Sequence, residues 1–238
     1  MDFDGVVVHS HPVHKRAWQM VCARVGQPVT ESSLEFITEG WKRQDILQHL
    51  FGTLTEAEMH EYGQLKDELV RAHLHLIQPV PGIPNLLADL SRRGLALAIA
   101  SSGTRDRVNY LLEHLRIGHY FHSIITSDDV SRGKPAPDLF LTAAVRLGIP
   151  PGQLLAIEDA VCGIEAANAA GMVCIGVADT RKASRLSVAG ARWVIQDFLG
   201  VTAADLIRLH ASVTQRDVIT RKVEVRCATY TKENNPHG

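Results

Sequence analysis

Met1-Asp2-Phe3-Asp4-Gly5 is the stretch around which the rest of this 238-residue chain is organised. Its two carboxylates are one residue apart, and the apolar run 6–8 follows them. In an extended backbone, successive side chains point to opposite faces, so Asp2 and Asp4 would share a face while Phe3 turns into a core. Paired carboxylates can hold a hard cation and divide acid and base chemistry between them. The same pattern is common in ordinary loops, so the rest of the chain has to decide.

Beyond residue 82, apolar strand-like runs alternate with helical segments that each carry one apolar face. The runs that we expect to be strands are 95–100, 123–126, 154–157, 173–177 and 193–195. Strands and helices in alternation, with continuously apolar strands, predict an α/β fold: a Rossmann-like, three-layer core in which helices cover both faces of a parallel sheet. Ligands of such sheets bind beyond the carboxyl ends of the strands.

Conspicuous polar residues lie at those strand ends. Ser101 follows the first run, Glu158-Asp159 follows the run 154–157, and Lys134 is in the loop before a helix that begins near Pro137. We therefore expect these side chains to converge on one rim of the sheet. If a helical unit is inserted directly after Gly5, Asp2 and Asp4 lie on that rim too.

Residues 12–79 show a helical pattern without a convincing strand. The predicted helical segments are 18–25, 30–40, 43–50 and 55–75, and Thr55 with the acids after it is typical of a helix N-terminus. We predict a discontinuous core domain (1–11 and 80–210) with an inserted all-helical domain (12–79). Residues 211–238 form a polar tail in which alternation at Val223, Val225 and Cys227 leaves an extra edge strand open.

The composition limits the kinds of molecule that this chain is expected to bind. The formal net charge is -1 and 45% of the residues are hydrophobic, so nothing points to nucleic acid or to a lipid surface, and no apolar run is long enough to cross a membrane. We expect a monomer or weak dimer that acts on a small molecule. The four cysteines have no C-x-x-C spacing and no leader is recognisable, which favours reduced thiols in a cytoplasmic protein. His9, His11 and His14 resemble a zinc motif, but they are more typical of a site entrance or a helix surface.

Four motifs in order give the chain a family resemblance. They are residues 2–6 (Asp-Phe-Asp-Gly-Val), 100–103 (Ala-Ser-Ser-Gly), 133–138 (Gly-Lys-Pro-Ala-Pro-Asp) and 157–159 (Ile-Glu-Asp), the last followed by 163–167 (Gly-Ile-Glu-Ala-Ala). Together they resemble the motifs of the haloacid dehalogenase superfamily, and more closely those of its β-phosphoglucomutase-like phosphatase branch. The resemblance covers residues 1 to about 209.

The resemblance implies a role for each motif. Asp2 would be the nucleophile that forms an aspartyl-phosphate, and Asp4 the general acid and base. The phosphate would be held by Lys134, by Ser101 and by the backbone amides of Ser102 and Gly103. The cofactor would be Mg²⁺, which Asp2, the backbone carbonyl of Asp4 and Asp159 would hold, with Glu158 as a further ligand or as a partner of these ligands. Each motif alone has an ordinary interpretation, as a turn, a solvated loop lysine or an acidic helix N-terminus.

The helical insert resembles the mobile cap of this branch, which closes over the substrate. By that comparison, four residues face the pocket: His14, Trp18, Gly40 and Arg43. Arg43 would bind a distal anionic or hydroxylated part of the substrate. Trp18 also belongs to an apolar stripe, and Arg43 also suits a surface position.

Two departures from the branch bear on the substrate. Glu39 stands before Gly40 where β-phosphoglucomutase has a lysine, and this charge reversal argues against a doubly anionic bisphosphate. The usual Asp-Ser-Glu-Pro after the first motif is replaced by residues 9–12, His-Ser-His-Pro, which alters the hinge and the pocket mouth.

We therefore predict a Mg²⁺-dependent phosphatase that acts on a small phosphorylated metabolite, with a sugar phosphate as the first candidate. A phosphohexomutase is the first alternative, and dehalogenase chemistry, which needs no Mg²⁺ cluster, fits less well. The alternative of another class is a catalytically silent binding protein, because only Met1 precedes Asp2 where the family has a whole strand. We expect that the true start lies upstream.

Overall fold

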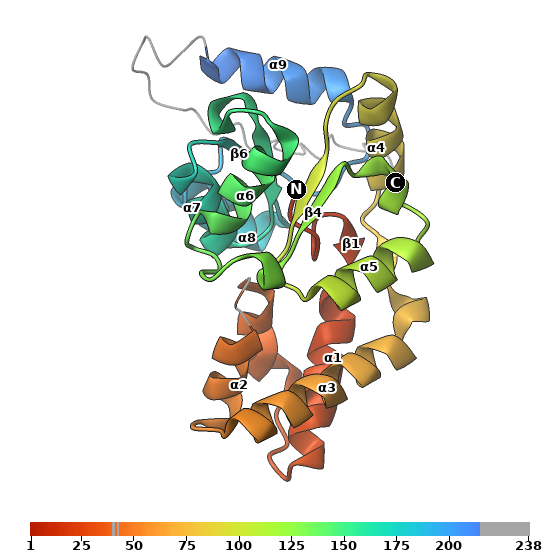
Figure 1. Cartoon of the computed structure of the whole chain (residues 1–238), viewed down its shortest axis with the longest axis vertical. Helices are drawn as coiled ribbons and strands as arrows, with labels where there is room; N and C mark the ends of the chain where they lie inside the picture. The colour runs from red at the N-terminus through yellow and green to blue at the C-terminus, as the bar shows by residue number, and fades with distance from the viewer. Residues whose placement is uncertain (40, 42, 215–238) are drawn as a thin grey trace, which may run out of the picture.

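The computed structural model describes residues 1–39, 41 and 43–214 (Figure 1). A group of helices made by the first third of the chain lies at one end of the long axis, and the strands with the later helices lie at the other. Gly40, one of the predicted pocket residues, is outside the described residues, as is the possible edge strand at Val223, Val225 and Cys227.

The strands form two parallel groups. β3 (Ala98–Ala100) pairs with β4 (Ser123–Ile125), and β5 (Leu155–Glu158) pairs with β6 (Val173–Val177), which pairs with β7 (Trp193–Ile195). β3 is shorter than the predicted run 95–100, because the backbone N–H of Leu97 donates to Nδ1 of His122 instead of joining the ladder.

The first two residues lie between these groups. The terminal amine of Met1 donates to the carbonyl of Ala98 at 2.8 Å, and the carbonyl of Met1 accepts from Ala100 at 2.9 Å. On the other side, the backbone N–H of Asp2 donates to the carbonyl of Ile157 at 2.8 Å. The main-chain bonds of Met1 to β3 and of Asp2 to β5 therefore hold Asp2 at the carboxyl ends of these two strands.

Alternate strand residues face two hydrophobic clusters. Ile99, Ile157 and Ile175 pack with α4 (Ile83–Arg92), α5 (Arg105–His114) and α9 (Ala203–Thr214), whereas Ala98, Ala156 and Cys174 pack with α6 (Asp138–Leu147), α7 (Val161–Ala169) and α8 (Thr180–Val188). Neighbouring strand residues point to opposite faces, so helices cover both faces of the strands. This confirms the α/β prediction with parallel strands.

The remaining elements of this part are short. They are the 3-10 helices Gly118–Tyr120, Ser127–Asp129 and Pro151–Gln153. α9 is longer than predicted, since it continues past residue 210 to Thr214. Residues 211–214 contain no glycine or proline that would end the helix. The start of the tail at residue 211 stays a prediction.

A two-stranded antiparallel sheet joins the helical part to the rest of the chain. β1 (Val8–His9) pairs antiparallel with β2 (Gln78–Pro79). Between them lie α1 (His11–Arg24), the 3-10 helix Glu31–Glu39, α2 (Arg43–Phe51), α3 (Glu56–Ala72) and the 3-10 helix Leu74–Leu76. The helical part thus begins after β1 and not directly after Gly5. The exact domain boundaries stay a prediction.

The helical part has its own apolar cluster. Its buried members are Trp18, Val21, Leu34, Ile46 and Leu47. The predicted start of the longest helix is confirmed, because Thr55 and Glu58 form a reciprocal capping box that supplies partners for two backbone N–H groups. Within the described residues, the structure contains no helix with both the length and the apolarity that a membrane crossing needs.

Candidate active site

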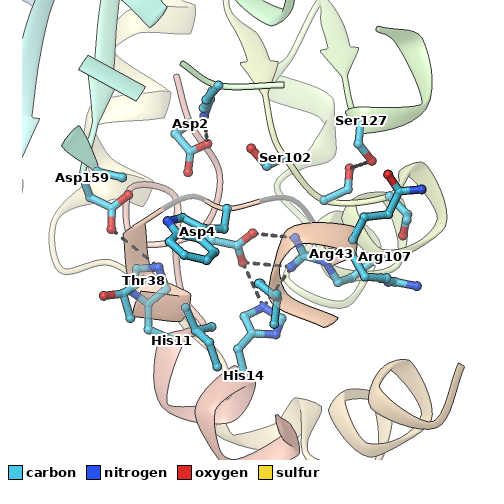
Figure 2. A pocket seen from close by; sticks show the side chains of 18 of the residues that line it. Asp2, Asp4, His11, His14, Thr38, Arg43, Ser102, Arg107, Ser127 and Asp159 are labelled. Atoms are coloured by element: carbon cyan, nitrogen blue, oxygen red, sulfur yellow. Dashed lines mark hydrogen bonds and ion pairs between the residues drawn. The ribbon is translucent and has the colours of Figure 1, made fainter. Parts of the chain in front are cut away.

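A cavity of about 370 Å³ lies where the carboxyl ends of the strands face the helical part (Figure 2). Asp2, Asp4, Lys134, Glu158 and Asp159 line it from the strand side. The residues that line it from the helical part include His14, Trp18, Thr38, Arg43 and Lys66. The strand-end residues predicted from the sequence thus lie around one cavity, with Ser101 as the exception.

The carboxyl groups of Asp2, Glu158 and Asp159 form a compact acidic cluster on the strand side of the cavity. Each offers a carboxylate oxygen, and these oxygens lie within 4.8 Å of one another. Asp2 and Glu158 are buried, and Asp159 is nearly so. Crowded carboxylate oxygens are the donors that Mg²⁺ prefers, so this donor set fits the predicted cofactor. The side chain of Asp4 is not part of this cluster.

Lys134 is the cation inside this cluster. Its ammonium group donates to both Asp2 and Glu158, and its side chain is only 2% exposed. Burial by itself would lower the pKa of Lys134, but the two carboxylates outweigh burial and the net shift is upward. Lys134 is therefore a buried, paired ammonium group rather than a solvated loop charge.

One lysine does not balance three carboxylates. Burial, followed in size by the charge of Glu158, raises the pKa of Asp159 well above its ordinary value. Burial also raises the pKa of Asp2 to about 7, although Lys134 opposes the shift. Both carboxyl groups thus favour the neutral form when no ion is bound, and a divalent cation would stabilise them as carboxylates.

Glu158 is held by the start of α7. Its Oε2 accepts from the backbone N–H groups of Asp159 and Ala160 at 3.0 and 3.2 Å. Gly163 makes the fit possible, because a Cβ there would lie 2.0 Å from Cδ of Glu158. The glycine of this motif therefore serves the orientation of a carboxylate.

Asp4 has partners of its own. Arg107 of α5 donates from Nη1 to Oδ1 at 2.9 Å and from Nη2 to Oδ2 at 2.6 Å (Figure 2). The hydroxyl of Ser10 donates to Oδ1, and Nε2 of His14 lies 3.2 Å from the same oxygen. Burial would raise the pKa of Asp4, but Arg107 and His14 hold it well below its ordinary value. Asp4 is an ionised carboxylate in this arrangement.

Two further cations face the cavity from the helical part. Arg43 donates from Nη2 to both oxygens of Asp67 at 2.8 and 2.7 Å. Lys66 is buried, and burial together with the charge of Arg107 lowers its pKa to about 7. The helical part therefore brings two cationic side chains to the cavity, and both lie close to the carboxylate of Asp67.

The motif at residues 101–103 is arranged differently from the prediction. Ser101 is fully buried outside the cavity lining, and its hydroxyl accepts from the backbone N–H of Gly103 at 3.0 Å. Ser102 and Gly103 line the cavity. The hydroxyl of Ser102 is buried without a described hydrogen-bond partner, which suits a donor kept for a ligand.

The histidines of the sequence motif separate in space. His9 is exposed, Nε2 of His11 lies 3.5 Å from Asp159, and His14 contacts Asp4. The structure thus does not bring the three rings to one centre. Burial, followed by the charge of Lys66, lowers the pKa of His14 to about 3, so the ring is neutral.

Sequence reasoning missed Arg107, Lys66 and Ser10. Arg107 follows Arg105-Asp106 on a helix, and Lys66 precedes Asp67, so both resembled solvated charges. A partial signal existed for Arg107, since it lies within the first turn of the helix that follows residues 101–103 and so is close to the strand ends. Which side of a helix meets the cavity is decided by packing.

Comparisons with known proteins agree with this geometry. A family model described as haloacid dehalogenase-like hydrolase matches residues 1–177. The fructose-1-phosphate phosphatase of Escherichia coli is 33% identical over 179 residues, which cover 74% of this chain and 93% of that protein. The β-phosphoglucomutase of Bacillus subtilis is 32% identical over 185 residues, which cover 74% of this chain and 80% of that protein.

Solved structures of proteins from the same group resemble the fold of this chain. The crystal structure of β-phosphoglucomutase from Clostridium difficile superposes with a TM-score of 0.78 at 25% identity, over 90% of this chain and 97% of that one. The predicted resemblance to β-phosphoglucomutase-like phosphatases is thereby confirmed.

Proposed function

This chain belongs to the haloacid dehalogenase-like hydrolase family, and we propose that it is a Mg²⁺-dependent phosphatase of a small sugar phosphate that works through an aspartyl-phosphate. The observation that carries the proposal is the meeting of Asp2, Lys134, Glu158 and Asp159 at one end of a cavity that also holds Asp4. Phosphoryl transfer needs a nucleophile, a proton carrier and positive charge at one place, and this cavity has candidates for each.

The acidic cluster would hold Mg²⁺. Asp2, Glu158 and Asp159 offer side-chain oxygens, and the carbonyl of Asp4 is the further ligand suggested by the family resemblance. When bound, the ion offsets the negative charge of the transferring phosphoryl group. The excess of carboxylates over cations at this point supports its presence.

In the first half of the reaction, a carboxylate oxygen of Asp2 attacks phosphorus and the bond from phosphorus to the sugar oxygen breaks. Lys134 and the hydroxyl of Ser102 offer donors to the phosphoryl oxygens, together with the backbone amide of Gly103. Asp4 is ionised in the free site, but the negative charge of a bound phosphate ester raises its pKa, so that it takes up a proton and gives it to the departing sugar oxygen.

In the second half, Asp4 takes a proton from a water molecule. The water oxygen attacks phosphorus, the bond between phosphorus and Asp2 breaks, and inorganic phosphate leaves. Asp4 is then protonated again for the next cycle, and the carboxylate of Asp2 is restored.

A sugar phosphate is supported by the lining of the cavity and by the relatives. The helical part offers Thr38, Arg43 and the ring of Trp18 to a polar substrate. We propose that residues 12–79 act as a cap whose closure excludes water and sets specificity, with Arg43 facing the distal part of the sugar. Fructose-1-phosphate phosphatase and β-phosphoglucomutase bear sugar phosphates in their names.

The test is a panel of phosphosugars assayed for phosphate release with Mg²⁺ and with EDTA. We expect turnover of at least one sugar phosphate that stops when EDTA is added and is absent in Asp2→Asn. Absence of turnover across the panel would contradict the proposal. Glucose 1-phosphate is assayed for conversion to the 6-phosphate in parallel, and conversion faster than phosphate release would favour a mutase instead.

A further inference from the structure

The ion pair between Arg107 and Asp4 has no part in the chemistry proposed above. Arg107 lies on α5 and Asp4 at the other end of the sequence, yet the guanidinium group donates to both carboxylate oxygens at 2.9 and 2.6 Å. The two side chains are 9% and 19% exposed. A two-bond fork of this kind sets the plane of the carboxylate as well as its place, which a single ammonium contact cannot do.

The rest of the surroundings restrains the same carboxylate. Ser10 and His14 both contact Oδ1 of Asp4, and Nη1 of Arg107 lies 3.0 Å from Nε2 of His14. Arg107 is the described partner that reaches Oδ2. Without Arg107, contacts to one oxygen remain, and the carboxylate can rotate about them.

The backbone is shaped for the guanidinium group. A Cβ on Gly103 would lie 2.0 Å from Nη2 of Arg107, so the space used by the fork exists because residue 103 is glycine. Gly103 does not have a positive φ, so its backbone conformation alone does not call for glycine. The backbone at Gly103 therefore leaves space for this ion pair, which distinguishes it from an ion pair on an open surface.

The other cations that line the cavity are paired with other carboxylates. Lys134 is paired with Asp2 and Glu158, and both Arg43 and Lys66 are paired with Asp67. Arg107 is thus the strong cationic partner of Asp4.

We propose that Arg107 is the positioning residue for Asp4. Its fork holds the carboxylate at the place from which protons pass to the sugar oxygen and from water. This inference rests on the proposed phosphatase function. A displacement of a catalytic group by about 1 Å can lower the rate on the order of 100-fold. Loss of the two hydrogen bonds from Arg107 should therefore slow the steps that need Asp4.

The test uses aryl phosphates of similar shape that differ in the acidity of the phenol that leaves. The ratio kcat/KM reports the steps up to formation of the aspartyl-phosphate. Phenol leaves poorly and needs a proton from Asp4, whereas para-nitrophenol leaves well without one. We expect Arg107→Gln to lower kcat/KM by ~100-fold for phenyl phosphate and by no more than ~3-fold for para-nitrophenyl phosphate.

Two further variants separate positioning from folding. Arg105→Gln is the matched control, because Arg105 is on the same helix and pairs with Asp129 outside the cavity lining. It should leave both values of kcat/KM within ~2-fold of the parent. Gly103→Ala keeps the charge of Arg107 but displaces its fork, and should produce the same substrate-dependent loss in a milder form.

The ratio of the two kcat/KM values does not depend on the fraction of enzyme that is folded. Arg107→Gln should also release para-nitrophenol in a burst, because hydrolysis of the aspartyl-phosphate still needs Asp4. Equal losses on both substrates, or an unchanged ratio, would overturn the role of Arg107. A parent enzyme that hydrolyses neither substrate nor any sugar phosphate would instead overturn the proposed function.

Discussion

Replacement of Lys134 by methionine should make the stability of this protein depend strongly on Mg²⁺. Methionine keeps most of the length of the side chain and removes its charge. Asp2 and Glu158 then lose their ammonium partner and remain buried beside Asp159. A buried charge without a partner is costly, because it has lost its water and gained nothing in return.

The size of the effect follows from the burial of the pair. The side chains of Lys134, Asp2 and Glu158 are 2%, 10% and 1% exposed, so solvent screens their interaction little. Removal of one partner from a buried pair typically costs ~3–5 kcal/mol. At ~2–4 °C per kcal/mol for a chain of this size, the unfolding midpoint in EDTA should fall by ~6–20 °C.

Mg²⁺ should restore much of this loss. An ion bound by the three carboxylates replaces part of the missing positive charge, and at 100 times its dissociation constant it adds ~2.7 kcal/mol to the free energy of unfolding. The assay is thermal or urea unfolding of parent and variant, each in EDTA and over a series of Mg²⁺ concentrations. Mg²⁺ should stabilise the variant more than the parent, in which Lys134 already offsets part of the charge.

The matched control is Arg132→Met. Arg132 precedes Lys134 by two residues and forms an ion pair with Asp138, but its side chain is 70% exposed. We expect a change of no more than ~1 kcal/mol and no altered response to Mg²⁺. A Lys134→Met variant as stable as Arg132→Met in EDTA would refute the interpretation of Lys134 as the buried counter-charge of the acidic cluster.

Three other predictions test the site. Asp2→Asn should lower kcat by ~10⁴-fold or more, because an amide is a poor nucleophile toward phosphorus; steady-state assays check it, and residual activity near the parent's would remove Asp2 from the mechanism. Arg43→Gln should raise KM for the sugar phosphate by ~10-fold or more, since a hydrogen bond to a charged group contributes ~1.5–3 kcal/mol, while KM for para-nitrophenyl phosphate stays the same; parallel changes would contradict a contact with the sugar. The pKa of His14 is lowered from 6.5 to about 3, so the unfolded chain takes up a proton before the folded one, and the parent should lose stability relative to His14→Gln as the pH falls from 6.5 toward 3. Urea unfolding in EDTA at several pH values measures this, and a difference that does not change with pH would contradict it.

Much of the fold followed from patterns within the sequence. The strands Val173–Val177 and Trp193–Ile195 have the predicted bounds, and Thr55 caps α3 as expected. These features depend on neighbours close in sequence, namely the alternation of side chains along a strand and the backbone N–H groups of a first helical turn. The ends of strands that depend on residues distant in sequence were predicted less well. β3 begins later than the predicted run 95–100, because the backbone N–H of Leu97 donates to Nδ1 of His122.

The candidate site divides in a similar way. The order of the motifs predicted that Asp2, Lys134, Glu158 and Asp159 would meet, because residues at the carboxyl ends of parallel strands share one edge. It did not predict that the hydroxyl of Ser102, and not that of Ser101, lines the cavity. Neighbouring residues in a turn point in different directions, and only the backbone path decides which one faces a ligand.

The sequence by itself determined the class of fold, the family and the acidic cluster with its lysine, since periodicity and motif order are properties of the chain. Only the tertiary structure showed that Arg107 and Lys66 line the cavity and that two oxygens of Asp4 accept hydrogen bonds from the guanidinium group of Arg107. A charged residue on a helix has the same local pattern whether it faces water or a pocket. The packing of α5 and α3 against the strand ends decides which of the two a residue faces. At Arg107, the absence of a side chain on Gly103 leaves the space that the guanidinium group occupies.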